Sequence, residues 1–177
     1  MHPAKTPLLS YYDGGDAIDL LRRQHREIDL RLAALGDAAV ADRPRLLAEA
    51  GDLLAVHMAI EERVFYPGLT PEAMEGAEPG FVVLAVEDHF DVKRALGELM
   101  RSDADDGAFA AMASLLRERV RAHATAEERL FPRIRRRLTR TRLRRLEYEM
   151  RVLEFELRTD AAPRRLVVED GGLSASA

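Results

Sequence analysis

Apolar residues recur at intervals of three and four in five long stretches of the chain, and this period predicts five amphipathic helices. The first helix begins after Asp16, whose side chain suits a helix N-cap, and ends at Gly36. A short connection at 38–42 follows. The remaining helices are expected at about 44–66, 81–101, 108–130 and 139–158. The fold class is therefore predicted to be all-α.

Turn-forming residues separate these helices. Pro67 and Gly68 are expected to stop the second helix, and residues 70–80, with two prolines and two glycines, are predicted to be a loop. Asp106 is a candidate cap for the fourth helix. Pro132 is expected to kink the chain or to restart a helix.

One motif occurs twice, in the second and fourth predicted helices. It reads His-x-x-x-Glu-Glu-Arg, then an apolar residue and Phe, and it begins at His57 and again at His123. A lone histidine, His25 or His89, lies on the helix before each motif. Two helical hairpins with matching inward faces predict a four-helix bundle with pseudo-twofold symmetry, followed by an additional C-terminal helix.

Each motif directs an imidazole and a carboxylate to the same side, because residues four apart share one face of a helix. Burying such a carboxylate is costly unless it is paired, and a metal ion is a suitable partner. Nitrogen and oxygen ligands without sulfur favour iron, manganese or zinc. The predicted metal ligands are His25, His57, Glu61, His89, His123 and Glu127.

Four imidazoles and two carboxylates suit a binuclear site. Each ion would take two histidines, and Glu61 and Glu127 could bridge both ions. This arrangement leaves room for a bridging oxo or hydroxo group and for one open position on each ion. Phe65 and Phe131, which end the two motifs, are expected in the core, where they could wall the site.

The residues beside these ligands have more than one interpretation. Glu62 and Glu128 are expected either in solvent or behind the ligands, one step round the helix. Asp29 and Lys93 lie one turn from the lone histidines and either face the open coordination positions as proton donors or point outward. Tyr66 is a candidate for a hydrogen bond to an oxygen bound at the metal.

The composition limits the class of protein. The chain has 177 residues, of which 47% are hydrophobic, and its net charge of -4 argues against nucleic-acid binding. It contains no cysteine, which excludes disulfides, thiolate metal sites and cysteine nucleophiles. Neither a signal peptide nor a transmembrane stretch is recognised, so a cytoplasmic protein with no membrane partner is expected.

The domain prediction has a flexible N-terminus at 1–15, a bundle domain at 16–138, a C-terminal helix at 139–160 and a disordered tail at 161–177. Apolar residues line one side of the C-terminal helix. This seam either packs back on the bundle or forms a subunit contact, and the second alternative implies a homodimer. The seam consists of Leu143, Leu146, Met150, Leu153 and Leu157.

Eight arginines crowd the stretch 133–145. They form either a surface for phosphate groups or an acidic partner, or a solvated junction offset by acids further along the helix. No aromatic residues interleave with these arginines, which argues against stacking on single-stranded nucleic acid. The offsetting acids are Glu147, Glu149, Glu154 and Glu156.

The two repeats resemble the hemerythrin-like, or HHE cation-binding, family over roughly residues 17–138. The repeat of that family has a histidine on one helix and His-x-x-x-Glu-Glu followed by Phe-Pro on the next. The resemblance implies a four-helix bundle with two iron ions in a non-haem di-iron centre, and the six candidate ligands match the ligand positions of the family.

One position departs from the oxygen-carrying hemerythrins. Those proteins have a second histidine one turn after the first on the third helix, where this chain has Lys93. The set of four histidines and two glutamates is more similar to the bacterial iron-cluster repair proteins and to iron-sensing hemerythrin domains. The repair proteins carry an N-terminal cysteine-bearing domain, and no such domain is recognised in this sequence.

Two classes of function are therefore expected. The first is a protein that binds or reacts with oxygen, nitric oxide or peroxide, or senses iron, in sensing or stress defence. The second is an enzyme that decomposes peroxide or nitric oxide. A sensor needs a surface that passes on its signal, and the C-terminal helix with its arginines is the candidate. A structural protein without a metal is a third alternative.

Overall fold

The computed structural model describes residues 15–75, 80–105 and 107–159, and all regular structure in these residues is helical. None of the described helices is long and apolar enough to cross a membrane. The five long helices are α1 (Ala17–Gly36), α2 (Arg43–Ile60), α5 (Phe81–Arg101), α6 (Phe109–Glu128) and α8 (Arg140–Thr159). Shorter helical segments are the 3₁₀ turn η2 (Val40–Asp42), the π-helical turn η3 (Glu61–Phe65), α3 (Tyr66–Gly68), α4 (Pro71–Met74) and α7 (Phe131–Arg137).

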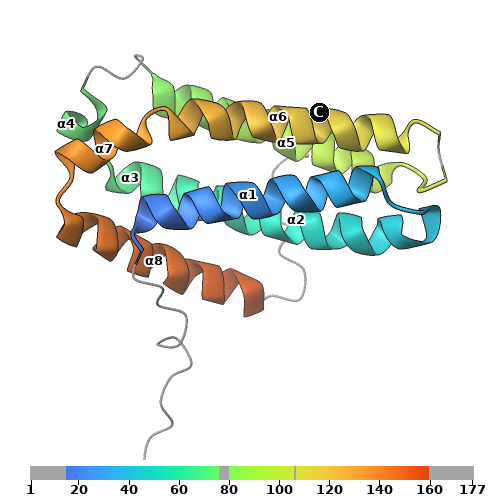
Figure 1. Cartoon of the computed structure of the whole chain (residues 1–177), viewed down its shortest axis with the longest axis horizontal. Helices are drawn as coiled ribbons and strands as arrows, with labels where there is room; N and C mark the ends of the chain where they lie inside the picture. Colours follow the sequence, from blue (N-terminus) through green and yellow to red (C-terminus); the bar gives the residue numbers. More distant parts are fainter. Residues whose placement is uncertain (1–14, 76–79, 106, 160–177) are drawn as a thin grey trace, which may run out of the picture.

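Helices α1, α2, α5 and α6 run side by side along the long axis of the molecule, while α8 lies obliquely beside α1 and α2 (Figure 1). Helix α1 packs against α2 and α6, and α5 packs against α6. Segments α4 and α7 close one end of the bundle. The prediction of an all-α four-helix bundle with an additional C-terminal helix is therefore confirmed.

The start of α1 is built as the sequence predicts. The Asp16 carboxylate accepts hydrogen bonds from the backbone N–H groups of Ile18 and Asp19, and the Asp19 carboxylate accepts one from the Asp16 N–H. This reciprocal pair satisfies donors that a helix start leaves free. Arg135 of α7 donates to both carboxylates, at 3.0 and 2.6 Å, and so ties the two elements together.

The second helix differs from its prediction as one regular helix to about residue 66. Its regular part ends at Ile60, and η3 forms one wide turn that the Tyr66 N–H closes by donating to the carbonyl of Glu61. Such π-helical turns hold an extra residue and occur often at functional sites. The corresponding place in the second repeat is different, because α6 ends at Glu128 and the chain restarts as α7.

Other boundaries also need correction or lie outside the described residues. The predicted loop at 70–80 contains the helical turn α4, whose first turn accommodates Pro71. The fourth helix ends two residues earlier than predicted, and Pro132 lies in the first turn of α7, so it restarts a helix. The predicted cap Asp106, the N-terminal residues predicted to be flexible and the C-terminal residues predicted to be disordered lie outside the described residues, apart from Gly15.

The core consists of two apolar clusters separated by a polar layer. One cluster fills the end of the bundle near the α1–α2 connection and includes Ile28, Leu54 and Leu96. The other fills the opposite end, beneath α8, and includes Ile60 and Phe131. Along α1 and α5 the single histidine separates residues of one cluster from residues of the other. On α2 the histidine lies where residues of the two clusters meet, and on α6 it follows the last residue of the first cluster. The histidines therefore meet at one level in the middle of the bundle.

Helix α8 turns its apolar seam toward the bundle. Leu143, Leu146 and Met150 are buried in the second cluster, and α8 contacts α1, α2 and η3. A Cβ atom at Gly68 would collide with Leu146, so the absence of a side chain there allows the close approach of α8. Arg142 also donates to the Gly68 carbonyl at 3.1 Å. In the structure the seam therefore packs on the bundle.

Several residues of the arginine-rich stretch 133–145 have structural contacts. Arg133 donates to the carbonyl of Glu75 at 2.6 Å, and Arg137 pairs with the carboxylate of the same residue at 2.9 Å. Of the acids expected to offset the stretch, Glu149 pairs with Arg145. Glu147 and Glu154 instead pair with Arg151 and Arg158 of α8. The stretch therefore joins α7 to the start of α1 and to Glu75, and it joins α8 to α3.

The packing of α8 predicts a specific loss of stability. Leu146→Ala should lower the free energy of unfolding by about 2–5 kcal/mol, because Leu146 is fully buried and its removal leaves a cavity. Tyr148→Ala, at an exposed position of the same helix, is the matched control and should change the stability by less than about 1 kcal/mol. Urea unfolding of the two variants measures the difference. Equal effects would contradict the packing of α8 on the bundle.

Candidate metal centre

The structure brings all six predicted ligands into the polar layer. Each bundle helix contributes one histidine, and the two glutamates come from η3 and from the last turn of α6. All six side chains are buried, and Glu61 is completely inaccessible to solvent. The residues are His25 on α1, His57 on α2, Glu61 on η3, His89 on α5, and His123 and Glu127 on α6.

Glu61 lies at the middle of the layer, and its two oxygens face different histidines. Oε1 lies 3.2 Å from Nε2 of His57 and 3.7 Å from Nε2 of His25. Oε2 lies 3.1 Å from Nε2 of His89 and 3.7 Å from Nε2 of His123. The histidines thus form two pairs, one from each repeat, that share Glu61 between them.

The outward nitrogen of each imidazole faces a polar partner from another helix. The Nδ1 atoms of His25 and His89 lie 2.9 and 2.8 Å from carboxylate oxygens, and Nδ1 of His57 lies 3.1 Å from an amide oxygen. Nδ1–H groups that donate outward leave the Nε2 lone pairs directed at the centre, as metal-binding histidines require. The partners of His25, His57, His89 and His123 are Glu128, Gln24, Glu62 and Asp88, the last at 3.6 Å.

The second glutamate of each motif reaches the lone histidine of the other repeat. Glu62 of the first motif holds His89, and Glu128 of the second motif holds His25. Both glutamates therefore lie behind the candidate ligands, which is one of the two expected placements. This exchange gives a physical reason for two consecutive glutamates in each motif, since one faces the centre and the other orients a histidine across the bundle.

The two charged residues one turn from the lone histidines have different surroundings. Lys93 is buried and donates to both oxygens of Glu62, at 3.2 and 3.4 Å, so its side chain does not point into solvent. Asp29 faces outward and accepts two hydrogen bonds from Arg117, at 2.7 and 3.0 Å. The outward expectation is thus correct for Asp29 and wrong for Lys93.

The charges of the centre depend on one another. Burial by itself lowers the pKa of His25, but the nearby carboxylates of Glu127 and Glu61 outweigh it and raise this pKa to about 10. The same competition between burial and carboxylate partners raises the pKa of His89 to about 9. Burial lowers the pKa of His57 to about 3, although Glu61 opposes the shift. Imidazolium protons therefore offset the buried carboxylates, and a metal ion would have to displace them.

The sequence profile of the hemerythrin HHE cation-binding domain matches residues 16–134, which hold all six of these side chains. The chain belongs to the hemerythrin HHE cation-binding domain family. A crystal structure of a hemerythrin HHE cation-binding domain-containing protein from Mycobacterium kansasii has the same fold, with a TM-score of 0.71 and 21% sequence identity. The match covers 88% of this chain and 98% of that one. Comparison with curated proteins gives no match.

The buried polar atoms of this HHE domain fit a cation. Nε2 of His25, Oε1 of Glu61 and both oxygens of Glu127 find no hydrogen-bond partner among the described residues, although all are buried. Orphaned polar atoms in an interior are costly unless an ion or a water satisfies them. Two groups of three residues have ligand atoms close enough to hold one ion each: His25, His57 and Glu61, and Glu61, His89 and His123.

The two inward glutamates of the HHE motifs are not equivalent. Glu61 contacts histidines of both pairs. Oε2 of Glu127 lies 3.3 Å from Nε2 of His25, and Glu127 belongs to neither group of three. Burial and then the charge of Glu61 raise the pKa of Glu127 to about 7. Burial alone would also raise the pKa of Glu61, but the facing imidazoles, His57 first, lower it. The sequence repeat therefore holds two different carboxylate environments.

Aromatic side chains close the centre on one side. Phe65 and Phe131 are fully buried, and the ring of Phe131 stacks parallel to His25 with 6.2 Å between the ring centres. The Tyr66 hydroxyl donates to Oε2 of Glu61 at 3.4 Å. Burial and the two glutamates raise the pKa of Tyr66 well above its usual value, so the hydroxyl keeps its proton. Tyr66 is thus placed to donate a hydrogen bond at the centre.

Sequence reasoning missed two residues that orient the histidines, Gln24 and Asp88. Gln24 is buried, accepts from His57 and donates to Glu154 of α8 at 3.4 Å, so it links the centre to the added helix. A signal for it exists in the sequence, because Gln24 falls four residues after Leu20 and four before Ile28 on the apolar stripe of α1. Asp88 is exposed and adjacent to His89, and its place near His123 depends on how α5 and α6 pack.

The exchange of glutamates between the repeats predicts an effect on metal affinity. Glu62→Ala should weaken metal binding by about 10–100-fold, because His89 loses the carboxylate that orients it. Glu62→Gln retains an acceptor oxygen and should bind metal more tightly than Glu62→Ala. Glu49→Ala, at a surface ion pair of α2, should leave the affinity unchanged. Competition with a chelator of known affinity measures all three, and equal affinities for Glu62→Ala and Glu49→Ala would refute the role of Glu62.

Proposed function

We propose that this HHE protein is a non-haem di-iron protein that binds or reacts with oxygen, nitric oxide or peroxide in sensing or stress defence. The observation that carries the proposal is the inward direction of four Nε2 atoms around a shared Glu61, beside a Glu127 whose oxygens lack partners. Four imidazoles and two carboxylates buried together at one level of the bundle suit a pair of divalent ions.

The proposed ligand set follows the two groups of the structure. His25 and His57 would hold one ion and His89 and His123 the other, with Glu61 shared between them. Glu127 would supply a further carboxylate, since both of its oxygens lack partners and it lies beside His25. The nitrogen and oxygen ligands also suit manganese or zinc, and the family resemblance favours iron.

Bound iron would supply exchangeable coordination positions and a reversible change of oxidation state. The chain contributes an apolar wall, because the buried rings of Phe65 and Phe131 exclude water from one side of the centre. It also contributes fixed imidazole orientations, which lower the cost of holding the ions in place. The enclosed position of the centre favours small ligands over large substrates.

Enzymatic decomposition of peroxide or nitric oxide is the second candidate. The Tyr66 hydroxyl favours it, because an O–H donor 3.4 Å from Oε2 of Glu61 could pass a proton to a small ligand in the pocket. Iron sensing or iron-cluster repair would instead use the centre to report or deliver iron. These alternatives differ in whether small ligands are consumed, and in whether iron occupancy changes the protein.

The proposed ligand set predicts the metal content. Protein loaded anaerobically with ferrous iron and freed of excess metal should contain about two irons per chain, since two three-residue groups are present. His57→Ala removes a ligand from one group and should lower the content toward one iron. Elemental analysis with a protein assay measures both. Firm binding of one iron or none by the unchanged protein would refute the binuclear assignment.

The ligand set also predicts reactivity with small molecules. Lys93 is paired with Glu62 rather than adding a further imidazole, so more coordination positions stay exchangeable. The reduced, iron-loaded protein should be oxidised in air, and it should change its absorbance when mixed with nitric oxide or hydrogen peroxide. Stopped-flow absorbance follows each reaction. An oxygen-dependent spectrum that persists and reverses under vacuum would contradict the prediction and indicate oxygen carriage.

A further inference from the structure

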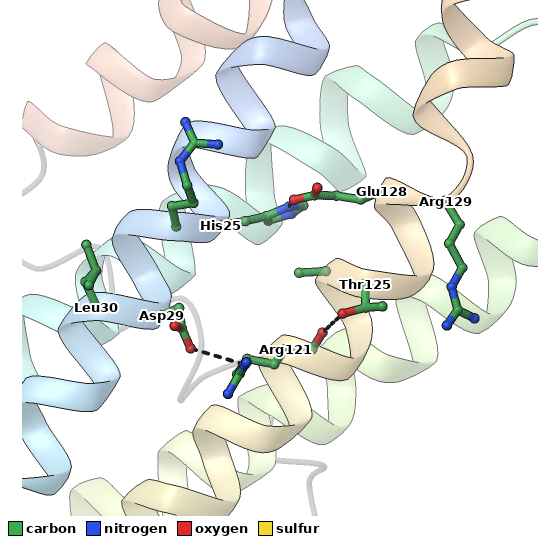
Figure 2. A pocket seen from close by; sticks show the side chains of 9 residues that line it. His25, Asp29, Leu30, Arg121, Thr125, Glu128 and Arg129 are labelled. Carbon is green, nitrogen blue, oxygen red and sulfur yellow. Dashed lines mark hydrogen bonds and ion pairs between the residues drawn. The ribbon is translucent and has the colours of Figure 1, made fainter.

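A groove of about 580 Å³ lies between α1 and α6 and reaches the candidate centre from outside. Figure 2 shows His25 and Glu128 together at one end of it, with Asp29 and Arg121 joined farther along. His25 belongs to the six candidate ligands, and Glu128 is the carboxylate that orients it. A second cavity of about 340 Å³, near Leu47 and Phe109, is lined by none of the six.

The two halves of the centre therefore differ in how they are covered. On the His89 side, the orienting Glu62 is held by the buried Lys93. On the His25 side, the orienting Glu128 is about one-third exposed, and its cationic neighbour Arg22, at 3.6 Å, is equally exposed. The difference leaves the outer face of the His25 imidazole next to the groove, whereas the His89 imidazole lies behind an inner ion pair.

The groove has an excess of positive charge. Its lining includes Arg26, Arg121 and Arg129 and two acids, Asp29 and Glu128. Each acid already has a cation from outside the lining, because Asp29 accepts two hydrogen bonds from Arg117 and Glu128 pairs with Arg22. Arg121 also lies 3.6 Å from Asp29, so five arginines share two acids in and beside the groove. The groove therefore keeps an excess of positive charge, and such a cleft attracts small ions of the opposite sign.

The α6 side of the groove offers few free hydrogen-bonding groups. The Thr125 hydroxyl already donates to the Arg121 carbonyl at 2.7 Å, and Ala124 contributes only a methyl group. Leu30 adds apolar surface beside the charged groups of the lining. The groove is open to solvent rather than enclosed, which suits a passage for small solutes better than a pocket that binds one shaped molecule.

We propose that the groove between α1 and α6 is the entrance through which small solutes reach the centre, and that it favours small anions over neutral molecules. The inference rests on the proposed metal centre but not on any reaction there. It makes Arg26 and Arg129 selectivity residues at the rim, and it makes Glu128 the last side chain that a solute passes before His25.

The test uses metal-loaded full-length protein, with zinc or iron, and measures how fast a chelator removes the metal. The informative quantity is the part of the release rate that rises in proportion to chelator concentration, since that part requires entry. Picolinate is the small anionic probe and 2,2′-bipyridine the neutral one. Ala124→Phe fills the groove, and Ala122→Phe places the same ring at an exposed position on α6 outside the lining.

Ala124→Phe should slow removal by both probes about ten-fold or more, while Ala122→Phe should leave both rates unchanged. Melting temperature and metal content of the two variants verify that each is folded and loaded. If the two phenylalanine variants lose metal at the same rate, the groove is not the entrance. If the unchanged, iron-loaded protein reacts with neither oxygen, nitric oxide nor peroxide, the proposed function is refuted and this test of the entrance remains valid.

Charge reversal tests the preference for anions. Arg26→Glu combined with Arg129→Glu should slow removal by picolinate about ten-fold at low salt, leave removal by bipyridine unchanged, and lose its effect at high salt. Arg140→Glu combined with Arg144→Glu changes the net charge equally on exposed positions of the arginine-rich stretch and α8, and it should have no effect. Equal effects of the two pairs, or equal effects on the two probes, would overturn the anion preference.

Discussion

The burial of six ionisable side chains at one level of a four-helix bundle is the constraint on which the rest of the structure depends. Removing carboxylates and imidazoles from water is costly, and the cost is tolerable only when each group finds a partner of opposite charge or a metal ion. Glu61 meets this requirement by facing all four histidines. Each bundle helix must therefore deliver its histidine to the same height between the two apolar clusters.

The outward Nδ1 atoms of the four histidines also have defined polar neighbours. Three of the four Nδ1 atoms lie within hydrogen-bonding distance of an oxygen from another helix, and the fourth faces Asp88. Because Glu62 and Glu128 each contact a histidine of the other repeat, these polar contacts join the two hairpins in addition to apolar packing. Gln24 extends the same network to α8, which links the added helix to the centre.

The internal repeat is symmetric in sequence and asymmetric in structure. The first Glu-Glu pair lies in a π-helical turn that continues into α3, while the second lies where α6 ends. Lys93 encloses one half of the centre, and the groove between α1 and α6 opens toward the other. The two ion positions would consequently share similar ligands and differ in their access to solvent.

The amino-acid sequence was enough to predict the five long helices, the bundle and the six residues of the polar layer. Periodic apolar positions and the repeated His-x-x-x-Glu-Glu spacing are local properties, and an i, i+4 pair shares a face in any regular helix. The sequence also limited Glu62 and Glu128 to two placements. It could not choose between them, because that choice depends on which helix lies opposite. The burial of Lys93, the difference between Glu61 and Glu127, and the packing of Leu146 against Gly68 appear only in the folded chain, since each follows from contacts between residues far apart in the sequence. The π-helical turn at η3 is local, but the repeated motif did not predict it, because the same motif ends α6 in the second repeat.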